Sequence, residues 1–153
     1  MSIIGLVDTA TGEGIVDADA RYGNVLPATD VTASGMKSSE VVGEAVAFGN
    51  LLYMKSDGKW WLADADAAAT MPGARMALAT ASADASCAML AIGWARNDDW
   101  AWTVGSLLYA STTPGAMTET APSGTGDQVQ VLGLAYGADN VWFAPSLVTA
   151  EVS

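Results

Sequence analysis

The feature of this sequence that most limits its fold is a segment that occurs twice. Residues 47–54 read Ala-Phe-Gly-Asn-Leu-Leu-Tyr-Met, and residues 103–110 repeat the Gly, both Leu and the Tyr in register. The similarity continues at the same offset, because residues 76–79 (Met-Ala-Leu-Ala) return as residues 132–135 (Leu-Gly-Leu-Ala). Landmarks that recur in one order at one spacing indicate an internal duplication.

A turn signal separates the matched blocks in each copy, Asp57-Gly58 in the first and Pro114-Gly115 in the second. Each copy is too short to bury its own apolar face. We therefore expect the two copies to fold against each other. The glycine before each Leu-Leu-Tyr is expected to supply a positive φ or a close backbone approach at the start of a strand.

Short apolar runs bounded by turn formers predict strands throughout the repeated region. Residues 50–55 and 59–63 flank Asp57-Gly58 and predict a β-hairpin with a type I′ turn. Residues 64–75 have room for one helical turn, which Pro72-Gly73 would end. The rhythm of short strands and turns predicts an all-β fold, a compact barrel or sandwich built from two repeated halves.

Residues 1–40 differ from the rest of the chain, being rich in Thr, Ala, Gly, Asp and Ser, with no Trp. We interpret them as an extended N-terminal arm with one or two short strands; an edge hairpin packed on the domain is the alternative. Residues 41–153 are then the duplicated β domain, with copy one at about 41–96 and copy two at about 97–148.

Composition excludes several kinds of partner and site. The net charge is −11, with 17 acidic and 6 basic residues, so the chain should repel nucleic-acid phosphates. Cys87, the only cysteine, allows no internal disulfide. We expect no secretion signal at the N-terminus and no membrane span, because no apolar run approaches the necessary length. These features predict a protein made in a cytoplasm.

The chain lacks the residues that most enzymes use. It contains no histidine, which removes the common catalytic triads and most zinc chemistry, and no phosphate-binding glycine motif. The acid pairs Asp17/Asp19 and Asp64/Asp66 do not continue into a calcium-binding pattern and are interpreted as solvated turn acids. We therefore expect no enzymatic activity, no cofactor and no metal.

The strand 51–54 is apolar on both faces, which suggests burial by the core on one face and by a neighbouring subunit on the other. Six tryptophans are many for this length, and Trp60 and Trp61 must point to opposite sides of their strand. Trp100 and Trp102 share a face. Core packing, subunit contacts and carbohydrate stacking are the three roles open to these side chains.

Residues 43–53, Asp57-Gly58-Lys59, residues 104–109 and Gly133-Leu134-Ala135 together resemble small virion proteins of tailed phages. The likeness is to capsid cement (decoration) proteins and to related domains of head and tail fibres, and it covers residues 41–148. It implies a β-barrel or β-tulip domain, commonly trimeric, that binds the outside of the phage head and clamps neighbouring subunits of the major capsid protein.

The resemblance thus implies a virion structural protein whose partners are the capsid lattice and further copies of itself. The residues expected at protein interfaces are Ile3, Ile4, Leu6, Tyr53, Trp60, Trp61, Trp100, Trp102 and Tyr109. The alternative is a fibre module that binds host-surface carbohydrate, with Trp100 and Trp102 as an exposed stacking pair.

Overall fold

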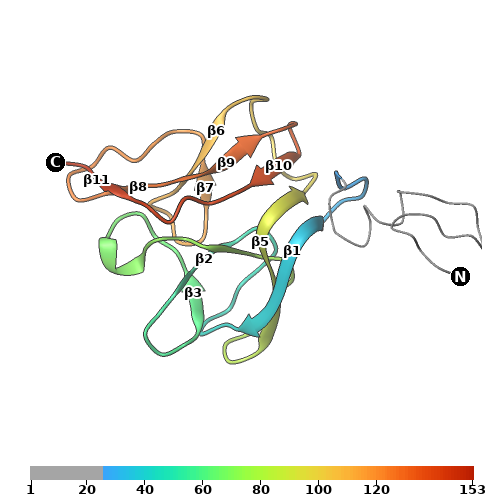
Figure 1. The fold of residues 1–153 in the computed structure, drawn as a ribbon, viewed down its shortest axis with the longest axis horizontal. Coiled ribbons are helices and arrows are strands. Elements are labelled where there is room, and N and C mark those ends of the chain that lie inside the picture. Colours follow the sequence, from blue (N-terminus) through green and yellow to red (C-terminus); the bar gives the residue numbers. More distant parts are fainter. Residues whose placement is uncertain (1–25) are drawn as a thin grey trace, which may run out of the picture.

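The computed structural model describes residues 26–153 and contains no α-helix in that range, which confirms the all-β prediction. The strands are β1 (Thr32–Val41), β2 (Leu51–Met54), β3 (Trp60–Leu62), β4 (Arg75–Ala77), β5 (Ser86–Arg96), β6 (Leu107–Ala110), β7 (Met117–Thr118), β8 (Gln128–Val129), β9 (Val131–Ala135), β10 (Asn140–Phe143) and β11 (Ala150–Glu151). One 3-10 turn, η1 (Ala68–Thr70), lies within the segment expected to hold a helical turn. Figure 1 shows β6 to β11 in the upper part of the molecule and β2, β3 and η1 in the lower part.

Nine strands of the described chain form one curled sheet in the order β3-β2-β4-β5-β10-β9-β6-β7, with β1 also paired to β5. β8 and β11 form a separate two-stranded sheet. The antiparallel contact between β5 and β10 divides this order into two halves with the same sequence of strands, β5-β4-β2-β3 on one side and β10-β9-β6-β7 on the other. β3, β2, β4 and β5 therefore correspond to β7, β6, β9 and β10.

The pairing register shows that β5 serves both halves of the sheet. Leu90 pairs with Lys37 of β1 and with Met76 of β4. Its counterpart Trp142 pairs with Trp94 of β5 and with Leu134 of β9. Hence β5 has the same place beside β10 in the second half of the sheet that β1 has beside β5 in the first half. We call β1–β5 the first unit, and the C-terminal half of β5 with β6, β7, β9 and β10 the second unit.

A bulge separates the two roles of β5. Met36 pairs with Ile92 but the next residue, Lys37, pairs with Leu90, so Ala91 has no partner across from it. The residues before Ala91 complete the first unit and those after it begin the second. A bulge bends and twists a strand, which suits a strand that passes from one unit to the next.

The glycine of each repeat has the predicted role. Gly49 and Gly105 have φ values of 88° and 87°. The residue after each glycine donates the hydrogen bond that closes a turn: Asn50 N donates to Ala47 O (3.1 Å), and Ser106 N donates to Thr103 O (3.0 Å). Left-handed φ values of this kind favour glycine. The two Leu-Leu-Tyr segments thus occupy equivalent places.

The predicted match of residues 76–79 to residues 132–135 is wrong by two residues. Leu51 pairs with Met76 and Leu107 pairs with Leu134, so Met76 corresponds to Leu134 and not to Leu132. One residue comes from a register shift in the second unit, where Leu108 pairs with Gly133 but Tyr109 pairs with Val131. The other comes from the turn between β6 and β7, which is one residue longer than that between β2 and β3: Ser111 N donates to Ala116 O, and Lys55 N to Lys59 O.

The predicted type I′ turn is also wrong. Lys55 N donates to Lys59 O (3.0 Å) and Gly58 N to Lys55 O (3.0 Å), which leaves a three-residue loop. Gly58 has a φ of 78°, but Asp57 does not have the positive φ that a type I′ turn requires. The hairpin itself, between β2 and β3, is as predicted.

The arm predicted for residues 1–40 lies outside the described residues as far as residue 25. From Thr32 the chain forms β1, which pairs along the whole length of β5. The expected boundary at residue 41 therefore coincides with the end of a strand of the sheet. Residues 32–41 are thus packed on the domain, as the edge-hairpin alternative expected, but they pair with the distant strand β5 and not within a hairpin.

The first unit closes on itself. After β1 the chain runs beside β3, where Val42 pairs with Trp60 and Gly43 N donates to Trp60 O (2.8 Å). This contact completes a ring of β1, β5, β4, β2 and β3 around its own apolar cluster. The cluster consists of Val42, Val46, Leu52, Trp60, Ala77, Ala81, Cys87 and Met89.

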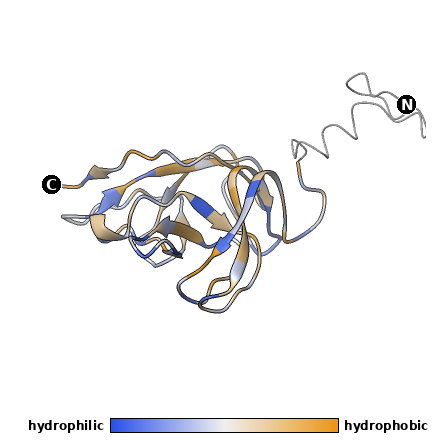
Figure 2. Ribbon diagram, turned by 60° about the horizontal axis from the view of Figure 1, so that its bottom comes forward, coloured by the Kyte–Doolittle hydropathy of each residue, from blue (hydrophilic) through white to orange (hydrophobic). Residues whose placement is uncertain are grey.

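The second unit is an open half-barrel filled by the first unit. Its inward residues include Leu108, Ala135 and Phe143, and they form one cluster with Leu51 and Met76 of the first unit. The outer face of the first unit is thus the plug of the second. Figure 2 shows hydrophobic segments spread over the strands of the whole described chain, as two cores require.

We expect Gly133→Ala to destabilise the fold by about 3 kcal/mol or more, from backbone strain and overpacking together. Gly133 has a φ of 152°, and a Cβ there would lie 1.8 Å from the carbonyl oxygen of Trp142 on the neighbouring strand. Denaturant unfolding measures the loss.

Gly105→Ala is the matched control, because its φ is 87° but a Cβ meets nothing within 4 Å. Its cost should be only the left-handed backbone term, about 1 kcal/mol. Equal losses for the two variants would contradict the close approach of β9 and β10.

Candidate functional site

The second unit carries a row of apolar side chains on its outer face. One residue comes from each of β5, β10, β9 and β6, and each pairs with the next across the strands: Trp94, Trp142, Leu134 and Leu107. Leu107 is 46% exposed, and the other three are half-buried. We call these four residues the outer row.

The corresponding row of the first unit is buried. Leu90, Met76 and Leu51 occupy the positions of Trp142, Leu134 and Leu107, and none is more than 1% exposed. They pack into the open half-barrel of the second unit. Nothing in the described chain covers the outer row in the same way.

The outer row is dominated by aromatic rings. The ring centroids of Trp94 and Trp142 lie 4.7 Å apart, and Tyr136 meets Trp94 edge-on at 4.6 Å. Tyr136 is 53% exposed. Rigid aromatic side chains that are already packed against one another lose little entropy when a partner covers them, and such residues concentrate the binding energy of protein interfaces.

Further apolar residues continue the surface on one side of the row, at the next pairs along the same strands. Met36 and Ile92 form the next outward pair between β1 and β5, and both are exposed. Val131 is exposed beside Tyr109, with which it pairs between β9 and β6. Together with the outer row these residues make a continuous apolar face, the kind of patch that marks interaction sites.

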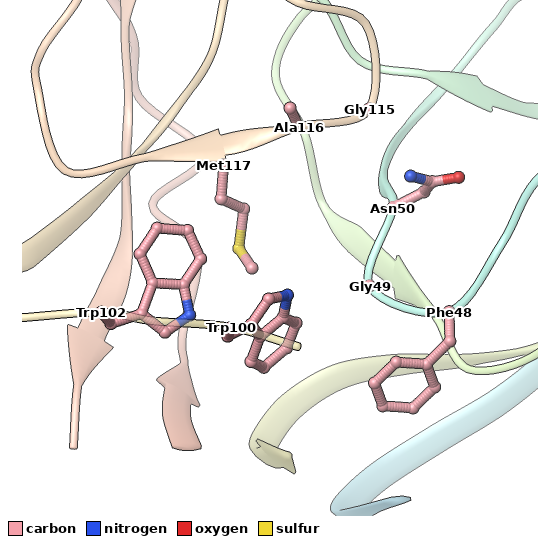
Figure 3. Close-up of a pocket in the computed structure, with 8 residues that line it drawn as sticks. All are labelled: Phe48, Gly49, Asn50, Trp100, Trp102, Gly115, Ala116 and Met117. Carbon is pink, nitrogen blue, oxygen red and sulfur yellow. The ribbon is translucent and has the colours of Figure 1, made fainter. Parts of the chain in front are cut away.

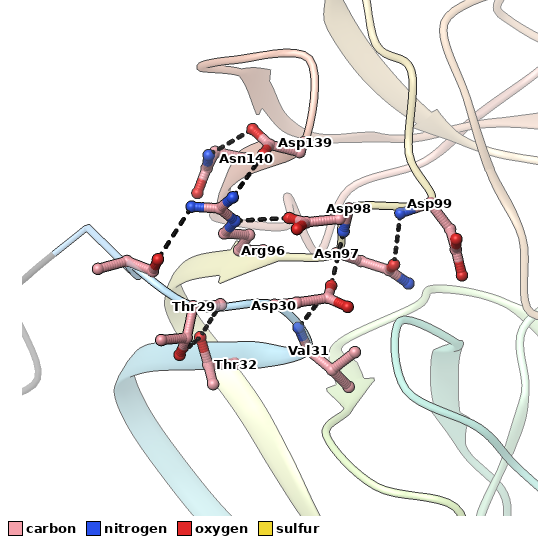
Figure 4. A network of polar contacts seen from close by, with 11 residues as sticks. Thr29, Asp30, Val31, Thr32, Arg96, Asn97, Asp98, Asp99, Asp139 and Asn140 are labelled. Carbon is pink, nitrogen blue, oxygen red and sulfur yellow. Dashed lines mark hydrogen bonds and ion pairs between the residues drawn. The ribbon is translucent and has the colours of Figure 1, made fainter.

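Charged groups gather at one end of this face, at the junction of β1, β5 and β10. Arg96 donates to Asp98 Oδ1 (2.7 Å) and to Ala28 O (3.1 Å) and pairs with Asp139 Oδ2 (3.1 Å). The hydrogen bond to Asp98 is the largest of the influences that raise the pKa of Arg96. Asp30 accepts a hydrogen bond from Asp98 N at 2.7 Å. Figure 4 shows that these bonds fix the start of the described chain against β5.

Two of the residues predicted for interfaces are core residues instead. Tyr53 is 8% exposed and Trp60 is 4% exposed, in the shared core and in the first unit's core respectively. Burial, with a smaller effect of Glu44, raises the pKa of Tyr53. Trp60 donates its indole N–H to Glu40 and lies 5.0 Å beneath the Arg75 guanidinium. The apolar second face of β2 is thus covered by the first unit's own core and not by a neighbouring subunit.

Trp61 and Tyr109 are both half-buried but lie apart from each other. Trp61 is held at the tip of the first unit, with Lys55 Nζ 4.0 Å above its ring and its indole N–H donated to Asp57 (3.1 Å). Tyr109 lies on β6, two residues from Leu107 and on the same face. Ile3, Ile4 and Leu6 lie outside the described residues.

Trp100 and Trp102 meet at a pocket of about 240 Å³ between the units, and not on an open platform. Their ring centroids are 6.0 Å apart and the planes are inclined at 53°. The pocket is lined by Phe48, Gly49, Asn50, Trp100, Trp102, Gly115, Ala116 and Met117. Figure 3 shows Trp102, Met117 and Trp100 on one side of it and Asn50 and Phe48 on the other.

Sequence reasoning missed Trp94 and Trp142, although both were visible as tryptophans. The signal that finds them is the strand register: only when Leu90 is matched to Trp142 does a buried leucine correspond to a partly exposed tryptophan. That match could not be made from the repeat alone, because the sequence around β10 does not resemble that around β5.

No protein-family model matches the chain, and a search of curated proteins also finds no match. Among residues 26–153 there is no group of three or more His, Cys, Asp or Glu side chains placed to hold a metal ion. The same part of the chain has no helix long and apolar enough to cross a membrane.

The two units predict different responses to the same substitution. Leu51→Ala should cost about 3 kcal/mol, because a buried leucine is removed from the shared core. Leu107→Ala, at the equivalent position, should cost less than about 1 kcal/mol because its side chain is 46% exposed. Denaturant unfolding of the two variants tests the assignment of the faces, and similar losses would show that it is wrong.

Proposed function

We propose that this protein is a non-enzymatic structural protein of a virion, a capsid decoration protein on the outside of a phage head. In this proposal it acts by binding other protein, namely the major capsid protein lattice and further copies of itself as a homotrimer. The outer row is the contact surface. The observation that carries the proposal is that this row is exposed at Leu107 and only half-buried elsewhere, while the equivalent row of the first unit is fully buried against protein.

The chemistry of the surface supports a protein partner. The row presents two tryptophans and two leucines, and the residues that extend it are Met36, Ile92, Val131 and Tyr109. None of these carries a charge, although the chain has a net charge of −11. Interfaces are similarly depleted of charge at their centres and enriched in aromatic residues and Met.

The sequence resemblance to cement and fibre proteins supports the same role. The pocket between the units is lined by no carboxylate, and a hydrolase without histidine would use a pair of them. What the fold offers is an apolar face on the second unit. A decoration protein needs such a face, because its affinity comes from buried area and aromatic anchors.

A carbohydrate-binding fibre module is the second candidate. It is favoured by the pocket, where Trp100 and Trp102 lie across from Phe48 and the side-chain amide of Asn50 (Figure 3). Aromatic rings beside an amide are suited to stacking and hydrogen bonding with a sugar ring. Binding of the isolated protein to host-surface glycans, with loss in Trp100→Ala, would favour this candidate over the decoration role.

Leu107→Asp is expected to reduce incorporation of the protein into particles at least tenfold, as for an interface hot spot worth about 2 kcal/mol. A charge within the apolar face would have to be desolvated on binding. The amount of protein in purified phage particles, with its occupancy in electron micrographs, measures the effect.

Leu147→Asp is the matched control, since Leu147 is 69% exposed and does not belong to the outer row. It should be incorporated like the wild type, and both variants should unfold at similar denaturant concentrations. Full incorporation of Leu107→Asp would refute the role of the outer row. Absence of the wild-type protein from the particles would refute the virion role itself.

A further inference from the structure

The two edge strands of the main sheet, β3 and β7, differ in whether another segment of the chain covers them. β3 ends the sheet at the first unit, and its free edge is covered by the segment after β1. Gly43 N donates to Trp60 O (2.8 Å), and Glu44 Oε1 accepts the backbone N–H of Leu62 (2.9 Å). Val42, which bridges to Trp60, is fully buried beneath this contact. An extended segment therefore closes the first unit.

β7 ends the sheet at the second unit, and Met117 on it corresponds to Trp60. Trp60 pairs with Met54 and Met117 pairs with Ala110, and Met54 and Ala110 are equivalent because each follows the Leu-Leu-Tyr of its own copy. In each hairpin the pair beside the turn is the hydrogen-bonded one: Lys55 N to Lys59 O, and Ser111 N to Ala116 O. Because hydrogen-bonded and non-bonded pairs alternate, the backbone N–H and C=O of Met117 point away from β6.

The segment equivalent to the one that covers β3 does not cover the edge of β7. Residues 97–104 correspond to residues 41–48, but Trp102 N donates to Ala138 O (2.8 Å), which holds the segment against the loop between β9 and β10. Its end is bonded to the residue that follows β7, where Glu119 accepts the N–H of Thr103. The edge at Met117 is left facing the pocket, and no other strand of the described chain pairs there.

The pocket beside this edge suits an apolar chain. No charged side chain lines it, and Phe48, Trp100, Trp102 and Met117 supply most of its wall. The indole N–H of Trp102 is buried and has no hydrogen-bond acceptor in the described chain; Figure 3 shows it on the side that faces Trp100. The unbranched Met117 side chain lies next to it and can move aside. The site thus combines an apolar slot, an unused strand edge and an unused donor.

We propose that residues Ile3–Val7 of this chain bind here as an extended strand along Met117, with apolar side chains in the pocket. This segment is an uncharged apolar run within residues 1–25, and it joins a β-branched residue to glycine (Ile4–Gly5) as Val42–Gly43 does in the first unit. The first unit is thus the internal precedent for the contact. The proposal does not depend on the virion role.

The position of the chain permits the contact. Asp30 accepts a hydrogen bond from Asp98 N (Figure 4), and Asp98 is two residues before Trp100, which lines the pocket. The 18 residues from Asp8 to Val25 span up to about 60 Å when extended. This length reaches the pocket of the same molecule, and the same docking between neighbouring copies would link them.

Hydrogen exchange at the Met117 amide tests the proposal in the full-length protein. The variant carries Ile4→Asp and Leu6→Asp, which place charge in the docking segment. If the segment pairs with the edge, the wild-type Met117 amide should exchange about tenfold or more slowly than the amide of this variant. The matched control carries Ile15→Asp and Val16→Asp, the same change in charge outside the segment, and should retain the wild-type rate.

Three results would overturn the proposal. The first is rapid exchange of Met117 in the wild type and the variant alike, which would leave the edge open. The second is protection that rises with protein concentration but is indifferent to the Ile4 and Leu6 substitutions, which would assign the edge to another surface of a second copy. The third is an equal loss of protection in the control, which would make the effect one of charge alone.

Discussion

Packing of the first unit's outer face into the open side of the second unit is the contact on which the rest of the structure depends. Leu51, Met76 and Leu90 project from three neighbouring strands into the half-barrel that Leu108 and Phe143 line. Without them the second unit would expose its core, because it lacks the closing segment that seals the first. The burial of large apolar side chains at this contact supplies much of the driving force for folding.

The same contact makes the two halves unequal. A duplicated chain has two copies of each surface. When one copy packs into the other, the outer face of the first copy and the inner face of the second are buried. The outer face of the second is then left over, and here it carries Trp94 and Trp142 where the first unit has Lys37 and Leu90. Larger aromatic side chains on the face that stays outside are typical of a surface that binds a partner.

Sequence reasoning predicted the class of fold and the repeat, because both depend on local signals. Gly49 and Gly105 mark the same turn, and alternating apolar residues mark the same strands. It could not predict that β5 would serve both units, because the Ala91 bulge leaves no mark in composition. The register of β9 failed for the same reason.

The candidate site was predictable only in part. Tryptophans were expected at contacts, but the choice of Trp60 failed because a strand residue's exposure depends on which face the closing segment covers, and that segment is set by distant pairing with β3. Trp100 and Trp102 were expected to share a strand face, but their segment forms no strand, and the structure places them around a pocket beside the unclosed edge of the second unit. Long-range pairing, and not residue type, decided each of these outcomes.

The central claim is that the outer row is the surface by which this protein meets other protein. Oxidative footprinting of tryptophan, with the free protein compared with assembled particles by mass spectrometry, tests it most directly. The account predicts that Trp94 and Trp142 are modified in the free protein and protected in the particle, while Trp61 is modified to the same extent in both. Equal modification of Trp94 and Trp142 in the two states would contradict it.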